Sequence, residues 1–374
     1  MSDKIKILFD SYHLYHLPQF EPLIDLLGMD KRFDIFHSTS NDIPNQEYEL
    51  CSSILRKKPG AFIEAKTERI RQEKIKNLDL DFFICGWSRY DIDKYVNRKT
   101  IVGMIYHGIG IKPSYWLDNH QRLDIRFVEG KYRVKQLQQN GIDTRLELTG
   151  FIKLDPIFQK NKIDINGIKL KYNLDPNKKT ILFAPTFYPS SVEPIGMNLG
   201  EYTKGFNVLI KPHLWTTFLN KFAEINHKEK NIIFNGLIRK YDHIHLISPE
   251  EYNIIPFYKV ADVLLTEASS TIYEMLACGK PVVVNRFFKL KLSHRLFRHR
   301  LYKRRLNQEM ENDISSFCFE AYKPNDIPLA LEKAFNQFSS KKDKIKEYQK
   351  KMLFKLDGLA ASRAKEVILS YKTN

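Results

Sequence analysis

Short, largely apolar runs alternate with helical patterns along the first part of the chain. Because most of these runs lack the alternation of a half-exposed strand, they predict strands covered on both faces, as in a parallel doubly wound sheet. A helical pattern at 20–27 separates the first two runs. The expected strands are 5–9, 33–37, 82–84, 101–105, 126–129 and 145–148.

A polar, Lys- and Asn-rich stretch at 150–177 then suits a domain boundary. A second set of strands is expected at 180–184, 206–211, 244–246, 263–265 and 281–284, and the chain is helical and highly charged from 326 to 371. The predicted division is a Rossmann-like domain over 1–152, another over 153–345, and a helical segment over 346–374 that packs back toward the first domain.

Two Rossmann-like halves with a final helical segment are typical of the GT-B architecture. This is an α/β fold in which two Rossmann-like domains face a central cleft. Ligands of open parallel sheets bind beyond the carboxyl ends of the strands. Polar residues that directly follow a strand are therefore the candidate site residues.

The stretch 258–285 carries the most specific local pattern. A short apolar strand leads into a polar loop that ends in Ser269 and Ser270, and a helix follows over 271–277. Gly279 ends this helix and Pro281 forbids its continuation. Two serines at a helix start lie beside unpaired backbone N–H groups, which suits a phosphate group. The alternative is that a serine only caps the helix.

Other polar residues follow strands in the same way. His107 comes after the strand 101–105 in a glycine-rich loop with Gly108. A histidine suits a general base because the ordinary pKa of its side chain is near neutrality. The alternative is a histidine satisfied by a neighbouring carbonyl. Thr186 follows the strand 180–184.

Lys211 and His213 follow the strand that begins at 206, where either could pair with phosphate, although His213 could equally be a loop residue without a role. Glu267 in the polar loop and Glu274 in the following helix are candidates to accept hydrogen bonds from ribose hydroxyls. The alternative for Glu274 is a place on the helix surface.

Composition narrows the class of protein. The 374 residues are 43% hydrophobic, so two sizeable cores are possible, and no run approaches the ~20 apolar residues of a membrane-spanning helix. The N-terminus reads as a strand rather than a signal peptide. The four cysteines are scattered without paired metal spacing, which fits free thiols in a reducing cytoplasm, and no metal site is expected.

The formal net charge of +16 calls for an anionic partner. No nucleic-acid-binding signature is present, so nucleic acid is not expected. Residues 286–305 contain no acid, and Phe287, Leu290, Phe297 and Leu301 recur among bases at spacings compatible with an amphipathic helix. This pattern suits the surface of an anionic membrane, and the alternative is an Arg-rich helix packed on its own domain.

Taken in order, these elements resemble the CDP-glycerol glycerophosphotransferase family, which includes teichoic-acid primases and polymerases. The resemblance covers most of the chain from about residue 100 onward. The chain departs from the family pattern in the loop after His107 and at Ile152, Lys153, Glu267 and Ala268. The matching elements are His-Gly at 107–108 followed by Lys112, Gly-x-x-x-x-Asp at 150–155, Ala-Pro-Thr at 184–186, Lys-Pro-His at 211–213, Thr-Glu-Ala-Ser-Ser at 266–270 with Glu274, and Asp-Gly-x-Ala-Ala-Ser-Arg at 357–363.

The resemblance implies a transferase on the GT-B fold, with the acceptor on the first domain and the nucleotide donor on the second. It would move glycerol phosphate, or a related polyol phosphate or sugar, from a CDP- or other nucleotide-linked donor to a lipid-linked or polymeric precursor of a cell-surface polysaccharide or teichoic acid. It implies no separate cofactor and a cytoplasmic protein peripheral to the inner membrane face. His107 and His213 would be catalytic, and Gly108 and Lys112 would belong to the acceptor loop. The donor phosphate and nucleotide fall to Thr186, Lys211, Thr266, Glu267, Ser269, Ser270 and Glu274.

Two other classes of function stay open on the same fold. A hexosyltransferase or a non-hydrolysing UDP-sugar 2-epimerase would use the same phosphate site, although such epimerases usually carry Ser-Gly-Gly where this chain has Ser269-Ser270-Thr271. A non-catalytic protein that binds membranes or polyanions is the third reading.

Overall fold

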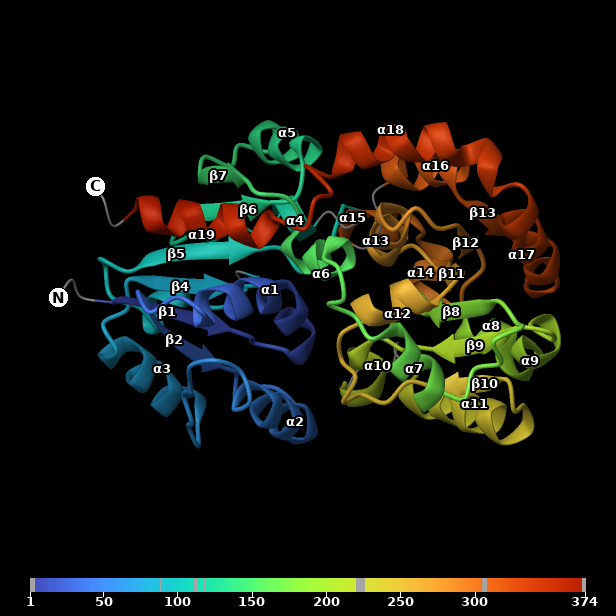
Figure 1. Cartoon of the computed structure of the whole chain (residues 1–374), viewed down its shortest axis with the longest axis horizontal. Helices are drawn as coiled ribbons and strands as arrows, with labels where there is room; N and C mark the ends of the chain where they lie inside the picture. Colours follow the sequence, from blue (N-terminus) through green and yellow to red (C-terminus); the bar gives the residue numbers. More distant parts are fainter. Residues whose placement is uncertain are drawn as a thin grey trace. The chain divides into compact units, whose positions relative to one another are not determined.

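The computed structural model describes residues 4–87, 89–110, 114–117, 119–219, 226–304 and 308–371. The chain divides into two compact units (Figure 1). Unit 1 comprises residues 1–107, 115–159 and 351–374, and unit 2 comprises 108–114 and 160–350. The structure describes each unit by itself, so the cleft expected between them stays a prediction.

Unit 1 is built on a seven-stranded sheet in the order β3-β2-β1-β4-β5-β6-β7, and every pairing is parallel. Its predicted strands are confirmed to within a residue at either end, and β3 is an unpredicted edge strand of two residues. The strands are β1 (Ile5–Asp10), β2 (Phe33–Ser38), β3 (Ala61–Phe62), β4 (Phe82–Cys85), β5 (Ile101–Ile105), β6 (Ile125–Val128) and β7 (Arg145–Leu148).

Helices separate these strands, as parallel pairing requires. The helix predicted at 20–27 is confirmed as α1, which packs beside the C-terminal helix α19 (Figure 1). The helices of unit 1 are α1 (Leu17–Gly28), α2 (Asn45–Leu55), α3 (Glu68–Asn77), α4 (Ser114–Leu117), α5 (Lys131–Gln139), α6 (Asp155–Phe158) and α19 (Ala360–Ser370), with the 3-10 turns η1 (Leu14–His16), η2 (Ile92–Lys94) and η3 (Ile152–Leu154).

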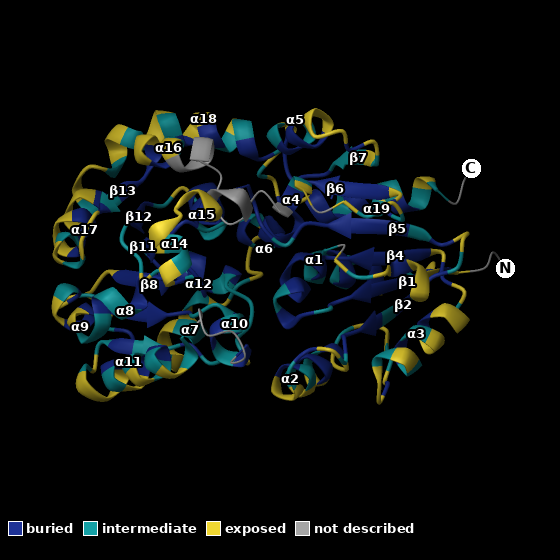
Figure 2. Cartoon of the chain, turned by 180° about the vertical axis from the view of Figure 1, so that it is seen from behind, coloured by how far each residue is buried: buried dark blue, intermediate teal, exposed yellow. Residues whose placement is uncertain are grey.

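Unit 2 is built on a six-stranded parallel sheet in the order β10-β9-β8-β11-β12-β13. The five predicted strands are confirmed, and β13 is an additional edge strand. Figure 2 shows the central strands of both sheets as buried, as their apolar sequences require, whereas the edge strands β3 and β7 of the first sheet are exposed or half-buried. The strands are β8 (Thr180–Ala184), β9 (Asn207–Ile210), β10 (Ile244–Leu246), β11 (Val263–Thr266), β12 (Val282–Asn285) and β13 (Phe319–Ala321).

The helices of unit 2 precede its first strand, lie between its strands or follow the last of them. They are α7 (Ile165–Lys171), α8 (Val192–Ile195), α9 (Leu199–Tyr202), α10 (Leu214–Phe218), α11 (His227–Lys240), α12 (Ile255–Val260), α13 (Thr271–Ala277), α14 (Leu292–Leu296), α15 (His299–Arg304), α16 (Gln308–Phe317), α17 (Ile327–Asn336) and α18 (Lys342–Met352), with η4 (Gly196–Asn198), η6 (Pro324–Asp326) and η7 (Phe338–Lys341).

One expected element is wrong: residues 286–305 do not form a single amphipathic helix. Lys289 makes an isolated antiparallel bridge with Ser190, and the two short helices α14 and α15 are separated at Phe297, whose backbone is non-helical. Leu301 is buried with Phe187 and Leu219 rather than presented to solvent. The apolar spacing therefore serves packing within unit 2 at this position.

Each sheet has a topological switch point, which is the place where the order of the strands reverses direction. The chain builds outward from β1 in one direction and from β4 in the other, and likewise from β8 and β11. Ligands of doubly wound sheets bind beyond the carboxyl ends of the strands at such a point. The residues that follow β1 and β4, and those that follow β8 and β11, are thus the expected ligand-binding positions.

Candidate functional site

Unit 2 brings most of the predicted donor residues to one edge of its sheet. Ala184 at the end of β8 pairs with Thr266 at the end of β11, and Phe183 pairs with Ile210 in β9. Thr186, Lys211 and the loop 267–270 therefore leave the sheet side by side. This edge is the β8/β11 switch point together with its neighbour β9.

Glu267 lies inside this edge and organises it. Its side chain is fully buried and accepts three hydrogen bonds, from the N–H of Thr186 at 2.7 Å and from the N–H and hydroxyl of Ser191 at 2.7 and 2.5 Å. Burial raises the pKa of Glu267, while the Ser191 and Thr186 donors favour the ionised form. In this arrangement Glu267 ties the loop after β8 to the end of β11, and its ribose-binding role stays a prediction.

Thr266 and Glu274 are also fully buried. The hydroxyl of Thr266 donates to the carbonyl of Ala184 at 2.7 Å, and the hydroxyl of Tyr258 donates to Glu274 at 2.9 Å. A place for Glu274 on the helix surface is therefore wrong. Thr266 thus ties the end of β11 to the end of β8, and Glu274 ties α13 to α12.

Ser269 and Ser270 are half-buried at the start of α13. Ser270 occupies the N-cap position without a capping hydrogen bond from its side chain. The N–H of Thr271 lies 3.4 Å from the hydroxyl of Ser269, longer than an ordinary N–H···O bond. Helix capping therefore does not account for the paired serines, and their phosphate role stays a prediction.

His213 forms the N-cap of α10 and accepts a hydrogen bond from the N–H of Trp215 to its Nδ1 at 3.1 Å. Since an N–H group only donates, Nδ1 must carry the lone pair, and in the neutral ring Nε2 carries the proton. His213 is thus held as a hydrogen-bond donor through Nε2. Lys211, two residues earlier, is 5% exposed.

His107 in unit 1 is held in the opposite way. Its Nδ1 lies 3.2 Å from the carbonyl oxygen of Gly86, directly after β4. Since a carbonyl oxygen only accepts, Nδ1 carries the proton and Nε2 keeps the lone pair, as a general base requires. Gly108, the next residue in the sequence, is buried, and Lys112 lies outside the described residues.

Two motifs of the family resemblance meet in unit 1 as a structural clasp. Asp155 accepts hydrogen bonds from the N–H groups of Ala360 and Ala361, at 3.0 and 2.7 Å, and so caps α19. Arg363 donates from Nε to the carbonyl of Thr149 at 2.6 Å and pairs with both carboxylate oxygens of Asp357. These residues hold the C-terminal segment against the end of β7.

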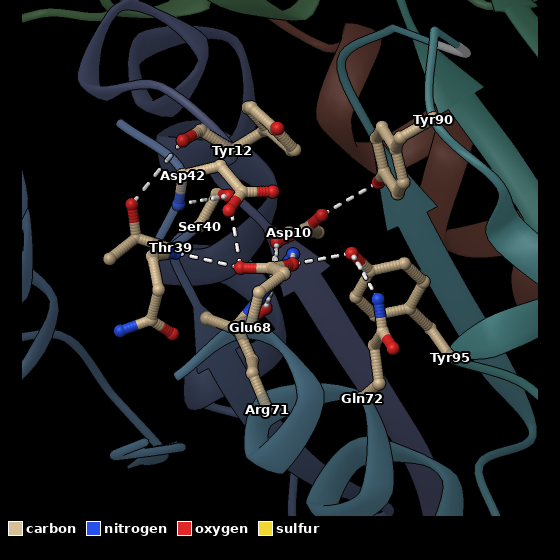
Figure 3. Close-up of polar contacts among 12 residues, drawn as sticks. Asp10, Tyr12, Thr39, Ser40, Asp42, Glu68, Arg71, Gln72, Tyr90 and Tyr95 are labelled. Carbon is tan, nitrogen blue, oxygen red and sulfur yellow. Dashed lines mark hydrogen bonds and ion pairs between the residues drawn. The ribbon is translucent and has the colours of Figure 1, made fainter. Parts of the chain in front are cut away.

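A buried ion-pair network that sequence reasoning missed lies at the end of β1 (Figure 3). Arg71 is fully buried and donates to Asp10 at 2.7 Å, to Ser38 at 3.1 Å and to Glu68 at 2.9 Å. Tyr90 closes the other side with a 2.6 Å hydrogen bond to Asp10. The network fixes the loops after β1, β2 and β4 relative to one another.

Within the described residues, no group of three or more His, Cys, Asp or Glu side chains could hold a metal ion. Over the same part of the chain, no helix is long and apolar enough to cross a membrane.

Comparisons with known proteins identify a similar family and a similar fold. The model of the family CDP-Glycerol:Poly(glycerophosphate) glycerophosphotransferase matches residues 116–289. The predicted family resemblance is confirmed. The match includes Thr186, Lys211, His213 and the serines of the β11 loop, and no curated protein sequence matches the chain.

Solved structures with a similar fold fall into two groups. The wall teichoic acid polymerase TagF superposes with a TM-score of 0.70 at 13% identity, over 98% of this chain and 89% of that chain. The S. aureus MnaA–UDP structure gives 0.64 at 15% identity, over 99% and 97%, and UDP-GlcNAc 2-epimerase from Neisseria meningitidis gives 0.60 at 14%, over 98% and 100%. At these identities the likeness shows the fold, which is GT-B as predicted.

Proposed function

We propose that this protein is a transferase that moves glycerol phosphate, or a related polyol phosphate or sugar, from a CDP- or other nucleotide-linked donor. The acceptor would be a precursor of a cell-surface polysaccharide or a teichoic-acid-like polymer. The observation that carries the proposal lies within unit 2, where Thr186, Lys211 and the loop 267–270 leave the sheet side by side at the β8/β11 switch point. The family match over 116–289 supports the choice of donor.

The chemistry follows for glycerol phosphate. An acceptor hydroxyl attacks the β-phosphorus, its proton passes to Nε2 of His107, and the bond from the β-phosphorus to the bridging oxygen breaks to release CMP. Nε2–H of His213 and the ammonium of Lys211 stabilise the charge that develops on the phosphate oxygens. Thr186, Ser269 and Ser270 hold the phosphates, and Glu267 positions the loop that carries Thr186.

The test is nucleotide release from a panel of donors, with a membrane extract as the source of acceptor. CDP-glycerol, CDP-ribitol and common UDP-, GDP- and CMP-sugars are compared. Release of CMP from a CDP-polyol is the expected result. Release of UDP or GDP from a nucleotide sugar would contradict phosphoryl transfer and favour a sugar transferase.

UDP-GlcNAc 2-epimerase from Neisseria meningitidis has a similar fold, so an epimerase is the alternative function. An epimerase changes the sugar while the nucleotide stays attached, whereas a transferase releases it. Product analysis of the same reactions separates the two. An epimerised nucleotide sugar without nucleotide release would replace our proposal with the epimerase.

We also propose that the protein works at the cytoplasmic face of an anionic membrane through α14 and α15. Leu292 and Leu296 are 68% and 67% exposed, and Phe297 is partly exposed beneath the guanidinium of Arg300. Exposed apolar side chains among bases suit the headgroup region of a membrane. The test is sedimentation with vesicles of phosphatidylglycerol and phosphatidylcholine, using a variant in which Arg295, Arg298 and Arg300 are changed to Gln. Unchanged binding by that variant would remove this role.

A further inference from the structure

Two polar side chains beside His107 are fully buried and make no hydrogen bond. Both ring nitrogens of His16 and both amide atoms of Gln19 lack a partner, and each residue is 0% exposed. A buried polar group without a partner costs about 1–3 kcal/mol. A cost incurred at two neighbouring residues indicates a function that needs them.

These residues lie at the switch point of the unit 1 sheet. His16 ends the turn η1 after β1, Gln19 lies in the first turn of α1, and both approach Gly86 directly after β4. A Cβ atom on Gly86 would come within 2.8 Å of Gln19 Nε2 and of His16 Cγ. Glycine is therefore required for this close approach between the ends of β1 and β4.

The surroundings define the chemistry of a ligand. Burial lowers the pKa of His16 well below its usual value, helped by His107, His13 and Arg89, so the ring is neutral. A neutral imidazole and an amide each offer one kind of donor and one kind of acceptor, which matches hydroxyl groups. The ring centroids of Tyr15 and Trp87 lie 4.3 and 5.1 Å from that of His16, so aromatic side chains pack directly against the imidazole.

The same position is held firmly and faces the predicted base. The N–H of Leu14 and the ring of His13 both contact the buried carboxylate of Glu47 at 3.1 Å, which fixes the turn that presents His16. The ring centroids of His16 and His107 are 5.2 Å apart. A hydroxyl bound to His16 would therefore lie next to His107.

We propose that His16 and Gln19 bind the hydroxyl groups of the acceptor, a glycerol or sugar unit, beside His107. The identification of the ligand as the acceptor rests on the proposed transferase function. The existence of a polyol-binding site at the β1/β4 switch point does not depend on that function.

The experiment measures binding of glycerol, glycerol 3-phosphate and N-acetylglucosamine to the full chain by saturation-transfer NMR, with thermal melting in parallel. The variants are His16→Phe and Gln19→Met, which keep the shape and remove the polar atoms. The matched control is His120→Phe, because His120 lies in the loop that leads into β6, whereas His16 and Gln19 follow β1. We expect at least one probe to bind the wild type and the control equally. The two variants should bind that probe at least about tenfold more weakly.

The melting temperature separates a ligand site from a structural one. Removing unpartnered buried polar atoms should leave the melting temperature equal or higher, whereas loss of a structural role would lower it. If the two variants fold poorly, Gly86→Ala keeps both polar side chains and displaces them, and we expect it to weaken binding as well. Binding of no probe to the wild type, or equal binding by all variants, would overturn the proposal.

CMP release from CDP-glycerol distinguishes this failure from failure of the proposed function. If polyol binding depends on His16 and no donor in the panel is turned over, the site stands and its assignment to an acceptor is overturned. If CMP is released and the KM for acceptor is unchanged in both variants, the transferase stands and the site is overturned.

Discussion

One ring nitrogen of His107 and one of His213 form a hydrogen bond with a backbone group. Whether that backbone group donates or accepts decides whether the other ring nitrogen is a donor or an acceptor. Gly86 offers a carbonyl and Trp215 offers an N–H, so the two rings are held in opposite tautomers. The sequence predicts the two histidines from their places after β5 and β9. It cannot predict the tautomers, because each depends on one backbone atom whose position only folding defines.

The first prediction concerns the base. His107→Gln should lower turnover by about 10²- to 10⁴-fold with little change in the KM for donor, because proton removal is lost while donor binding in unit 2 is not. Steady-state nucleotide release at varied donor concentration measures both the turnover and the KM for donor. A folded variant with full turnover would contradict the assignment.

The second prediction concerns Glu267. In Glu267→Gln one acceptor oxygen becomes an NH₂ group that faces the N–H of Thr186 or of Ser191. We expect the free energy of unfolding to fall by about 1–3 kcal/mol and the KM for donor to rise, because the loop after β8 is released. Urea denaturation and donor titration measure the two effects. Glu250→Gln, on the exposed surface of the same unit, is the control and should change neither.

At the scale of elements, apolar runs predict the strands well because buried parallel strands need them on both faces. The two that were missed, β3 and β13, are edge strands of two and three residues. The error at 286–305 has a different cause. The spacing of apolar residues there is real, but the backbone breaks at Phe297 and Leu301 turns into the core, which a pattern of residue types does not reveal.

The clasp between Asp155 and α19 yields a prediction about pH. Burial raises the pKa of Asp155 from 3.8 to about 6, against the two backbone donors that favour the carboxylate. Between these values the folded state binds more protons than the unfolded state, so this residue makes stability fall as pH rises from about 4 to about 6. In Asp155→Asn, the decrease in the free energy of unfolding over this pH range should be smaller by ~1–2 kcal/mol.

Urea unfolding at intervals across that pH range measures the difference between the wild type and Asp155→Asn. Asp143→Asn serves as the control, since Asp143 lies in the loop before β7 of the same unit, outside the clasp. Parallel pH profiles for the wild type and Asp155→Asn would show that Asp155 titrates normally and would contradict the prediction.

For the whole molecule, the positions of the sites depend on strand order, and strand order is what the sequence leaves undetermined. Residues that follow a strand can be named in advance, as Thr186, Lys211 and His107 were. His16, Gln19 and Arg71 could not, because they lie in a short turn or on helices. Arg71 belongs to α3, whose sequence is mostly polar, and its contacts with Asp10, Ser38 and Glu68 explain its complete burial.

The C-terminal segment completes unit 1 from the far end of the sequence. Residues 351–374 belong to this unit, and Ala360, Ala361, Ala364 and Ile368 of α19 are buried. The fold of unit 1 therefore cannot form fully without residues 351–374. Unit 2, apart from a short segment at 108–114, is continuous from 160 to 350.

Deletion of residues 357–374 should consequently destabilise unit 1 alone. The loss of α19 exposes its apolar contacts on α1 and leaves Asp155 without the N–H groups of Ala360 and Ala361, for a cost of about 4 kcal/mol. Hydrogen exchange followed by mass spectrometry should show faster exchange in β1 and β4, with β8 and β11 protected as before. Deletion of 372–374 is the control and should change neither unit. Equal loss of protection in both sheets would mean that the two units unfold as one cooperative body and would contradict the division drawn here.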